Sequence, residues 1–557
     1  MSPLRRLSLG QWVGSSAIWL LPLLSGWLLT RSAPHQSLTP TVWVALVPLL
    51  LFLHRAATPG RAFLGAWLSG LVYFLFMVFP FTSLIWWGWA FTPEEYQESL
   101  RQQRLFLWIW YPLTSVWCAA WWGLWGAALV SLARSSRVCI WLAAGLWILL
   151  CEWVRSRVFF DFTWGYLGYA LHPYETLSQV AALTGVTGLS ALIVLVNAWV
   201  AHTLRSAWSL LRPRGSEPSA APELSHPARE LLVTLSVLIA AYGCWTTGAR
   251  YARHPEPGQP EPVRIAALQA SRRTYAREEF EAGALDWTYT PLIDAAIEAG
   301  AAVLVLPESV WLAKLKLDEA PFPETLSRHV TPEEIHDFLA PHLGGSGATI
   351  LVGFDAGRQG ELHNSMLAWD AGGMMGMYSK RRLTPFAEYP PGWFRHLAPK
   401  NRITYRAGRG AQLFAINGLR VGGFICQEAQ FPHLARESVL AGAQLLVTTG
   451  NDGIFRHPAV AHGHQVAAQF RAIETHRPIA RAMKTGFSSL IDAHGRVLKR
   501  SHLDQQAFLI EPLTPSDRTT PYTRWGDWPV ALAALLILPA CLARLAGKNR
   551  GTHTYFP

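Results

Sequence analysis

The length, composition and charge of the chain exclude several classes of protein. With 557 residues it is long enough for several soluble domains, but 51% of its residues are hydrophobic and only 15% are charged, against about 25% charged in a typical soluble protein. This excludes a disordered or fibrous chain and argues against a purely soluble one. The net charge of +11 fits a membrane protein, whose basic residues collect in cytoplasmic loops. No nucleic-acid motif accompanies the charge, so we expect no nucleic-acid partner.

The chain contains eight apolar windows, each nearly free of charged residues. They run through residues 11–29, 41–54, 62–88, 105–132, 138–153, 177–202, 230–249 and 528–546. Most approach the roughly 20 residues that a helix needs to cross a bilayer, so we expect eight transmembrane helices. A cleaved signal peptide is the alternative for the first window, but no convincing small-residue cleavage site precedes the second.

Basic residues collect in alternate connections, counting the two chain ends, and this predicts the orientation. They are Arg5 and Arg6, Arg55 and Arg61, Arg134 and Arg137, the group Arg205, Arg212, Arg214 and Arg229, and finally Arg544, Lys548 and Arg550. By the positive-inside rule both termini are cytoplasmic. We therefore expect a seven-helix transmembrane domain (1–253), a domain on the opposite side of the membrane (254–525), and a C-terminal transmembrane helix with a cytoplasmic tail (526–557).

The region 254–525 has the pattern of an α/β domain. Short β-rich runs alternate with helical patterns such as 289–299 and 465–475, as in a sheet covered by helices. The predicted strands are 263–268, 302–306, 349–353, 413–416, 421–425 and 444–448.

Cys426 is the one cysteine of six that lies outside the apolar windows. Standing alone in its domain, it is either buried and inert or a reactive thiol. It ends the β-run 421–425 and is followed two residues later by the carboxylate of Glu428. A strand end holds a side chain at a rigid and accessible edge, as a nucleophile requires.

Two further residues have a similar setting. Glu308 follows the strand-like run 303–307, and Lys380 precedes a segment that reaches Glu388. Lys380 is conspicuous because only seven of the 48 basic residues are lysines. Singly, Glu308 reads equally well as an acid at a helix N-terminus and Lys380 as a solvated surface charge. The ordered set Glu, Lys, Cys is much more specific.

This ordered set resembles the catalytic triad of the nitrilase superfamily, and the chain resembles its membrane-embedded branch, the apolipoprotein N-acyltransferases. The other matching motifs are Lys380-x-x-Leu383-x-Pro385-Phe386-x-Glu388, Asn451-Asp452, Arg471-Ala-Ile-Glu474-x-x-Arg477-Pro478, 162–169, 185–190 and Asn197. The resemblance implies a multi-span α-helical membrane domain plus an α/β nitrilase-like domain, an α-β-β-α sandwich. It also implies a bacterial inner membrane with the catalytic domain 254–525 on its periplasmic side.

The resemblance implies the chemistry as well. Glu308 would accept the proton of Cys426, and Lys380 would stabilise the negative oxygen of the tetrahedral intermediate. Glu388 would orient Lys380 or the acceptor, and Glu428 would support the site electrostatically. Cys426 would take an acyl chain from a phospholipid as a thioester and pass it to the α-amino group of the diacylglyceryl-cysteine of a lipoprotein. We expect no cofactor, and we expect a monomer.

Apolar residues of two loops are candidates for the substrate entrance, although these loops read equally well as ordinary packed loops. The candidates are Trp393, Phe394 and Phe455. Three neighbouring histidines have no Cys or carboxylate at a metal-ligand spacing, so we expect no metal site. They are His457, His462 and His464.

Several positions depart from the family pattern. They are Gln427 where the acyltransferases commonly have Tyr, Gln269-Ala270-Ser271 in place of Gln-Gly-Asn, Gly453-Ile454-Phe455 in place of a closely following aromatic pair, and Lys484-Thr-Gly486 in place of an amide-rich run. Three alternatives therefore stay open: a divergent paralogue that acylates another amine, a membrane-tethered nitrilase-type amidohydrolase that uses water, and a non-catalytic scaffold.

Overall fold

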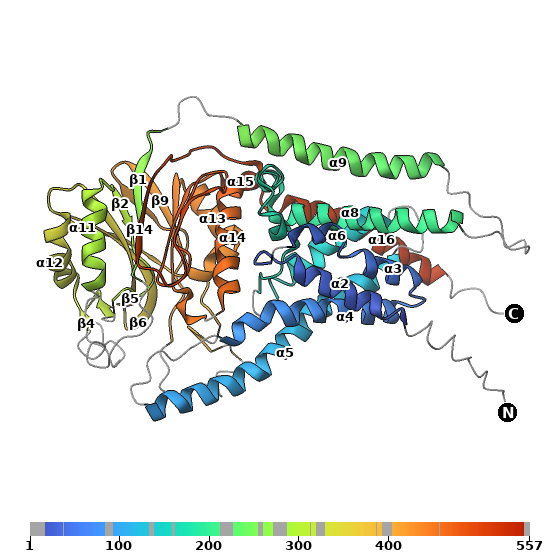
Figure 1. The fold of residues 1–557 in the computed structure, drawn as a ribbon, viewed down its shortest axis with the longest axis horizontal. Helices are drawn as coiled ribbons and strands as arrows, with labels where there is room; N and C mark the ends of the chain where they lie inside the picture. Colours follow the sequence, from blue (N-terminus) through green and yellow to red (C-terminus); the bar gives the residue numbers. More distant parts are fainter. Residues whose placement is uncertain are drawn as a thin grey trace, which may run out of the picture. The chain divides into compact units, whose positions relative to one another are not determined.

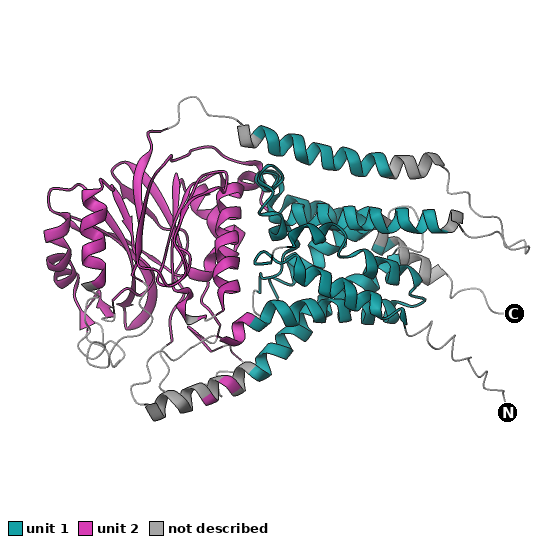
Figure 2. Ribbon diagram, viewed as in Figure 1, with its two compact units in different colours: residues 1–79, 108–250, 527–557 teal, residues 80–107, 251–526 magenta. Residues whose placement is uncertain are grey.

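The chain folds into two compact units. The computed structural model describes residues 17–36, 38–83, 93–132, 139–158, 162–211, 227–253, 260–270, 287–311, 314–318, 329–385, 387–390, 392, 404–455 and 457–550. Figure 1 shows the elements in chain order. Unit 1 comprises residues 1–79, 108–250 and 527–557, and unit 2 comprises residues 80–107 and 251–526 (Figure 2).

Unit 1 is helical, and a helix lies in each of the eight apolar windows. The longer helices are α2 (Leu20–Arg31), α3 (Val47–Arg55), α4 (Pro59–Val78), the C-terminal part of α5 (Pro93–Leu132), α6 (Cys139–Leu146), η4 (Trp147–Val154), α8 (Ala181–Leu211), α9 (Pro227–Arg253) and α16 (Trp528–Arg550). The short ones are η1 (Thr39–Trp43), η5 (Leu167–Leu171) and α7 (Glu175–Ser178). Small residues let the helices approach each other closely. A Cβ at Gly26 of α2 would lie only 2.4 Å from the backbone oxygen of Ser69 in α4, so this contact requires a glycine.

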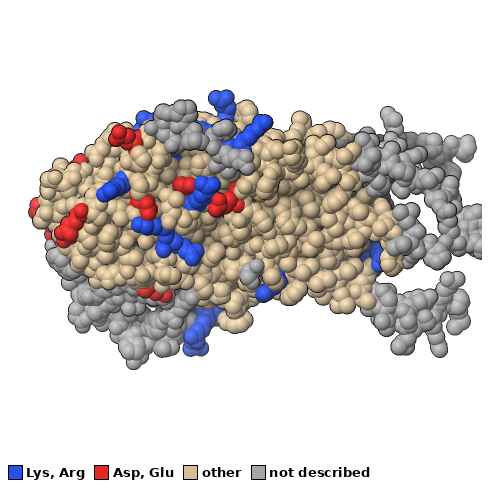
Figure 3. All heavy atoms as spheres, turned by 45° about the horizontal axis from the view of Figure 1, so that its top comes forward, with Lys and Arg blue, Asp and Glu red and all other residues tan. Residues whose placement is uncertain are grey.

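The surface of unit 1 fits a lipid environment. Three helical stretches of the described residues are long and apolar enough to cross a membrane, namely Pro59–Ser83, Trp108–Leu132 and Ala181–Trp208. Large apolar side chains of this unit are exposed, among them Trp27, Trp108, Trp245 and Leu535, and on the face in Figure 3 the charged side chains of the described residues gather mainly on unit 2. Such exposure is expected where lipid rather than water surrounds the helices. The number of crossings and the boundaries of the three regions stay predictions.

Unit 2 contains two β-sheets. The first has the order β14-β1-β2-β5-β3-β4, with β6 pairing β5 and β7. Its strands are β1 (Val263–Gln269), β2 (Val303–Val305), β3 (Lys314–Lys316), β4 (His329–Val330), β5 (Thr349–Arg358), β6 (Glu361–Asp370), β7 (Gly373–Ser379) and β14 (Ala507–Leu513). The second has the order β13-β12-β11-β10-β9-β8, with β8 (Leu413–Ile416), β9 (Leu419–Ile425), β10 (Leu445–Gly450), β11 (Ile479–Met483), β12 (Ser489–Ile491) and β13 (Val497–Arg500).

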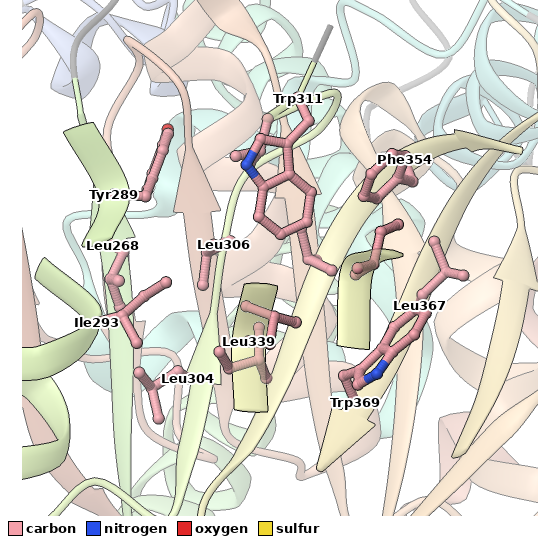
Figure 4. Close-up of a cluster of buried hydrophobic side chains, with 14 of the residues drawn as sticks. Leu268, Tyr289, Ile293, Leu304, Leu306, Trp311, Leu339, Phe354, Leu367 and Trp369 are labelled. Carbon is pink, nitrogen blue, oxygen red and sulfur yellow. The ribbon is translucent and has the colours of Figure 1, made fainter. Parts of the chain in front are cut away.

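Side-chain alternation along the strands builds the layers. Ile265 and Ala267 of β1 belong to a buried cluster that also contains Val421 and Val447 of the second sheet. Ala266 and Leu268, with the opposite parity, belong to the cluster in Figure 4, which includes residues of α11 (Thr290–Glu298) and α12 (Pro332–Leu343). On the outer face of the second sheet lie α13 (Pro432–Leu440) and α14 (Pro458–Thr475) (Figure 1). The four layers confirm the predicted α-β-β-α sandwich, and the helices of unit 1 confirm the predicted helical membrane domain.

The predicted strands all exist, as β1, β2, β5, β8, β9 and β10. The helix expected at 289–299 is α11, and the one expected at 465–475 is the second half of α14, which begins at Pro458. Sequence reasoning missed the antiparallel strands β6, β7 and β12 to β14. Of these, β7, β13 and β14 lie at an edge of their sheet, whereas β6 and β12 are paired on both sides.

Candidate active site

The three residues of the predicted triad lie just beyond strand ends in unit 2. Glu308 follows β2, Lys380 directly follows β7 of the same sheet, and Cys426 directly follows β9 of the second sheet. Their exposed fractions are 8%, 1% and 4% respectively. The two sheets therefore bring together three reactive groups that are widely separated along the chain.

Lys380 lies between two carboxylates. Its Nζ is 3.0 Å from Oε1 of Glu388 and 3.4 Å from Oε1 of Glu308. Burial alone would lower the pKa of Lys380, but the charges of Glu308 and Glu388 outweigh it and hold that pKa above its ordinary value. Lys380 is therefore a permanent ammonium group at neutral pH.

Asn364 of β6 fixes the two acids relative to each other. Its Nδ2 donates to Oε1 of Glu308 at 2.5 Å and to Oε1 of Glu388 at 2.6 Å. Its backbone carbonyl accepts the N–H of Lys380 at 2.8 Å. One strand residue thus holds the acid, the cation and the second carboxylate in a single network.

Cys426 occupies a sharp turn. Its φ is +56°, a left-handed conformation that a residue with a side chain adopts only where the surroundings hold it, at a cost of about 1–3 kcal/mol. It begins the short helical turn η8 (Cys426–Gln430). Burial raises the pKa of the thiol well above its ordinary value and the charge of Glu308 raises it further, whereas Lys380 and a backbone hydrogen bond from Asn451 lower it. The thiol at rest is therefore protonated and needs a base when substrate binds.

Two family models match the chain. The model described as Carbon-nitrogen hydrolase matches residues 264–520, which include Glu308, Lys380 and Cys426. The model described as Apolipoprotein N-acyltransferase N-terminal domain matches residues 25–199 of the helical part. Together with the relatives described next, these two matches show that the chain is similar to the apolipoprotein N-acyltransferases along nearly its whole length.

Relatives of the family match along nearly the whole chain. An apolipoprotein N-acyltransferase of Gloeobacter violaceus is 29% identical over 549 residues, which cover 95% of each protein. One of Geobacter metallireducens is 28% identical over 549 residues, which cover 96% of each. Among solved structures, a carbon-nitrogen hydrolase from Helicobacter pylori is 17% identical with a TM-score of 0.34, covering 49% of this chain and 94% of its own.

Glu428 ties the turn that begins at Cys426 to the strand end that carries Lys380. Its two carboxylate oxygens accept the backbone N–H groups of Ile425 at 2.7 Å, Arg381 at 2.7 Å and Arg382 at 2.9 Å. The hydroxyl of Tyr378 donates to the same carboxylate at 2.8 Å. With four donors it fixes the backbone of both segments, and its charge also interacts with that of Lys380.

Asp452 holds the loop that follows β10. Oδ1 of its carboxylate lies 2.7 Å from Nδ1 of His464, and Nη2 of Arg481 donates to Oδ2 at 2.9 Å. Burial would raise the pKa of Asp452, but His464 and Arg481 outweigh it and hold that pKa below its ordinary value. The neighbouring Asn451, whose backbone bonds the sulfur of Cys426, is thereby kept in place.

The predicted entrance residues have different outcomes. Phe455 lies in unit 2, with its ring centroid 5.5 Å from that of Phe81 and 6.4 Å from that of His464. Trp393 and Phe394 lie outside the described residues. Among the residues that the structure describes, no group of three or more His, Cys, Asp and Glu side chains is arranged to hold a metal ion.

Sequence reasoning missed Asn364 and Arg481. Asn364 shares its strand face with Met366 and Ala368 of the core between the sheets. A polar residue in that alternation is the signal that could have found it. Gln427, a departure from the family pattern, is half-buried, and its amide donates to the carbonyl of Arg382 at 3.4 Å.

Proposed function

We propose that this protein transfers an acyl chain from a phospholipid to the N-terminal α-amino group of a diacylglyceryl lipoprotein, through a thioester on Cys426. Similarity to the apolipoprotein N-acyltransferases along nearly the whole chain supports the reaction. The observation that carries the mechanism is the position of Lys380, between Glu308 and Glu388 and in electrostatic contact with Cys426. It supports a mechanism in which a base, a nucleophile and a fixed positive charge surround one reacting carbon.

The first half-reaction forms the thioester. Glu308 takes the thiol proton as the sulfur of Cys426 attacks the ester carbonyl carbon of the phospholipid. The carbonyl oxygen becomes negative, and the ammonium group of Lys380 stabilises it. As the intermediate collapses, the ester C–O bond breaks and the proton passes from Glu308 to the glycerol oxygen. The products are the acyl-enzyme and a lysophospholipid.

The second half-reaction forms the amide. The α-amino nitrogen of the lipoprotein attacks the thioester carbon, and Glu308 accepts a proton from that nitrogen. The C–S bond then breaks, and the proton returns to the sulfur. Exclusion of water by a lipid surface favours the amine over hydrolysis. Glu388 holds Lys380, and Glu428 fixes the nucleophile turn.

The surroundings of the site complete the proposal. We place the helical unit in the bacterial inner membrane with eight spans and the three regions 1–253, 254–525 and 526–557. The catalytic domain lies on the periplasmic side, where both lipid substrates reach the thiol past Trp393, Phe394 and Phe455. The protein acts as a monomer, without nucleic acid.

Acyl transfer in vitro tests the reaction. Purified protein in micelles is given a phospholipid labelled in its acyl chain and a synthetic diacylglyceryl lipopeptide. We expect label in the lipopeptide amide with the wild type and none with Cys426→Ala. Cys426→Ser should collect acyl-enzyme but turn over slowly, because an oxyester resists aminolysis. Release of labelled fatty acid without amide would favour the amidohydrolase alternative, and full transfer by Cys426→Ala would overturn the proposal.

Labelling from one side of the membrane tests the orientation. The side chain of Asp517 in the outer domain is 60% exposed, so a cysteine there is open to reagents. A charged maleimide that passes the outer membrane but not the inner one should label Asp517→Cys in intact cells. Labelling only after the inner membrane is broken would place the domain in the cytoplasm.

A further inference from the structure

Lys484 is a buried lysine beside the active site that the reaction above does not use. It follows β11 of the second sheet and is 5% exposed. It also belongs to the run Lys484-Thr-Gly486, where the sequence departs from the amide-rich pattern of the family. A buried ammonium group needs polar partners, so the contacts of Lys484 indicate its role.

Contacts connect Lys484 to the nucleophile through the backbone. Its N–H donates to the carbonyl of Gly450 at 3.0 Å. Gly450 ends β10 and packs against Cys426, since a Cβ at Gly450 would lie 3.3 Å from the Cα of Cys426. The main chain of Lys484 is therefore fixed to the sheet that carries the thiol.

The side chain of Lys484 reaches the other sheet. Its Nζ donates to the backbone carbonyl of Ser309 at 3.0 Å. Ser309 directly follows Glu308 and has φ +46°, a left-handed conformation that requires support from its surroundings. The ammonium group of Lys484 thus binds Ser309, the strained residue next to Glu308.

Other hydrogen bonds support this turn from the side of the first sheet. The hydroxyl of Ser309 donates to Oδ1 of Asp355 at 3.3 Å, and Tyr405 donates to Oδ2 of the same aspartate at 3.0 Å. The N–H of Gly353 donates to the carbonyl of Pro307 at 3.0 Å. Asp355 and Gly353 both belong to β5, so they fix Glu308 within its own sheet. The position of Glu308 relative to Cys426 depends in addition on contacts between the two sheets.

We propose that Lys484 is a positioning residue for Glu308. By joining the Ser309 carbonyl to the end of the second sheet, Lys484 sets the distance between the carboxylate of Glu308 and the thiol of Cys426. The inference rests on the proposed function for the roles of Glu308 and Cys426. An asparagine or glutamine at position 484 is shorter and uncharged, so it cannot make the same contact from the same backbone.

The test uses the burst of p-nitrophenol from a p-nitrophenyl fatty-acid ester in full-length protein in micelles. The burst amplitude counts competent thiols, and the burst rate constant measures attack by Cys426. Lys484→Met removes the donor at nearly equal volume. We expect its burst rate constant to fall by about tenfold to a hundredfold, the range for a displaced catalytic group. The amplitude and the KM for the ester should stay within about twofold of wild type, and Lys484→Arg should restore most of the rate.

Lys499→Met is the matched control. Nζ of Lys499 in β13 also donates across the sheets, to the carbonyl of Ile510 in β14 at 2.9 Å, but its side chain is 46% exposed and lies outside the active-site network. It should burst at the wild-type rate. A wild-type burst rate constant in Lys484→Met overturns the inference. A loss of burst amplitude at an unchanged rate constant also overturns it, because that result marks a merely structural residue. The ester needs neither lipid substrate, so failure here is distinct from wild-type transfer by Cys426→Ala, which would overturn the proposed function itself.

Discussion

The Nζ atom of Lys380 lies 3.0 Å from Oε1 of Glu388, and both side chains are buried, with 2% and 10% of their surfaces exposed. Glu308 is the second acid beside the same ammonium group, at 3.4 Å. Two carboxylates therefore share one cation, and all three side chains are largely buried. Such an arrangement is stable only while all its members are present, since an uncompensated buried charge is costly.

Removal of the cation should destabilise unit 2. Lys380→Met leaves Glu308 and Glu388 buried without their ammonium partner, so we expect a loss of about 3–5 kcal/mol in the free energy of unfolding, together with loss of acyl transfer. Thermal unfolding in detergent checks the first effect. Lys499→Met is the control, because its exposed ion pair with Glu511 is worth at most about 1 kcal/mol. Equal unfolding midpoints for the two variants would contradict the shared-cation arrangement.

Glu308→Gln should separate thiol acidity from catalysis. The charge of Glu308 raises the pKa of Cys426, so its removal lowers that pKa and the thiolate forms at lower pH. We expect the pH midpoint for alkylation by iodoacetamide to move down, while acyl transfer falls by at least about a hundredfold because the base is lost. A midpoint that moves up would show that Glu308 does not face the sulfur as an anion.

Two members of the predicted triad, Glu308 and Cys426, follow strands that are recognisable in the sequence, whereas Lys380 follows β7, which sequence reasoning missed. Buried parallel strands are short apolar runs, and β2 and β9 have this form directly before Glu308 and Cys426. The helices of unit 1 are equally recognisable in the sequence, because their segments are apolar regardless of how the helices pack against one another.

The supports of the triad are not predictable in the same way. Asn364 meets Glu308 because β6 pairs antiparallel with β5 in a register that places Asn364 opposite Asp355. Lys484 and Ser309 are separated by 175 positions along the chain. Both contacts depend on the pairing and stacking of sheets, which no local pattern encodes. Trp393 and Phe394 were named from composition alone and stay predictions.

Glu428 should prove to be a positioning residue. Its carboxylate accepts three backbone N–H groups and the Tyr378 hydroxyl. Glu428→Gln turns an amide N–H₂ toward some of these donors, so buried groups lose partners at about 1–3 kcal/mol each. We expect lower thermal stability and a fall in kcat with little change in KM. Tyr378→Phe removes only one donor and should cost about 1 kcal/mol with most activity kept.

Gly353 should be required for activity because the Glu308 turn lies directly over it. A Cβ at Gly353 would lie 2.5 Å from the Cα of Glu308 and 2.5 Å from the carbonyl oxygen of Pro307. Both are backbone atoms, so Gly353→Ala must push Glu308 away from β5. We expect a loss of about a hundredfold in kcat, since a displacement of about 1 Å has that effect on a catalytic group.

Gly376 provides the control for this substitution within the same sheet. A Cβ at Gly376 of β7 would meet only the ring of Phe414, at 3.6 Å, which is an ordinary contact. Gly376→Ala should therefore transfer acyl chains at close to the wild-type rate. Because both changes add one methyl group to a strand glycine, the difference between the two rates measures the displacement of Glu308. Equal rates for the two variants would mean that the position of the acid tolerates such a shift, and that Glu308 is not the base.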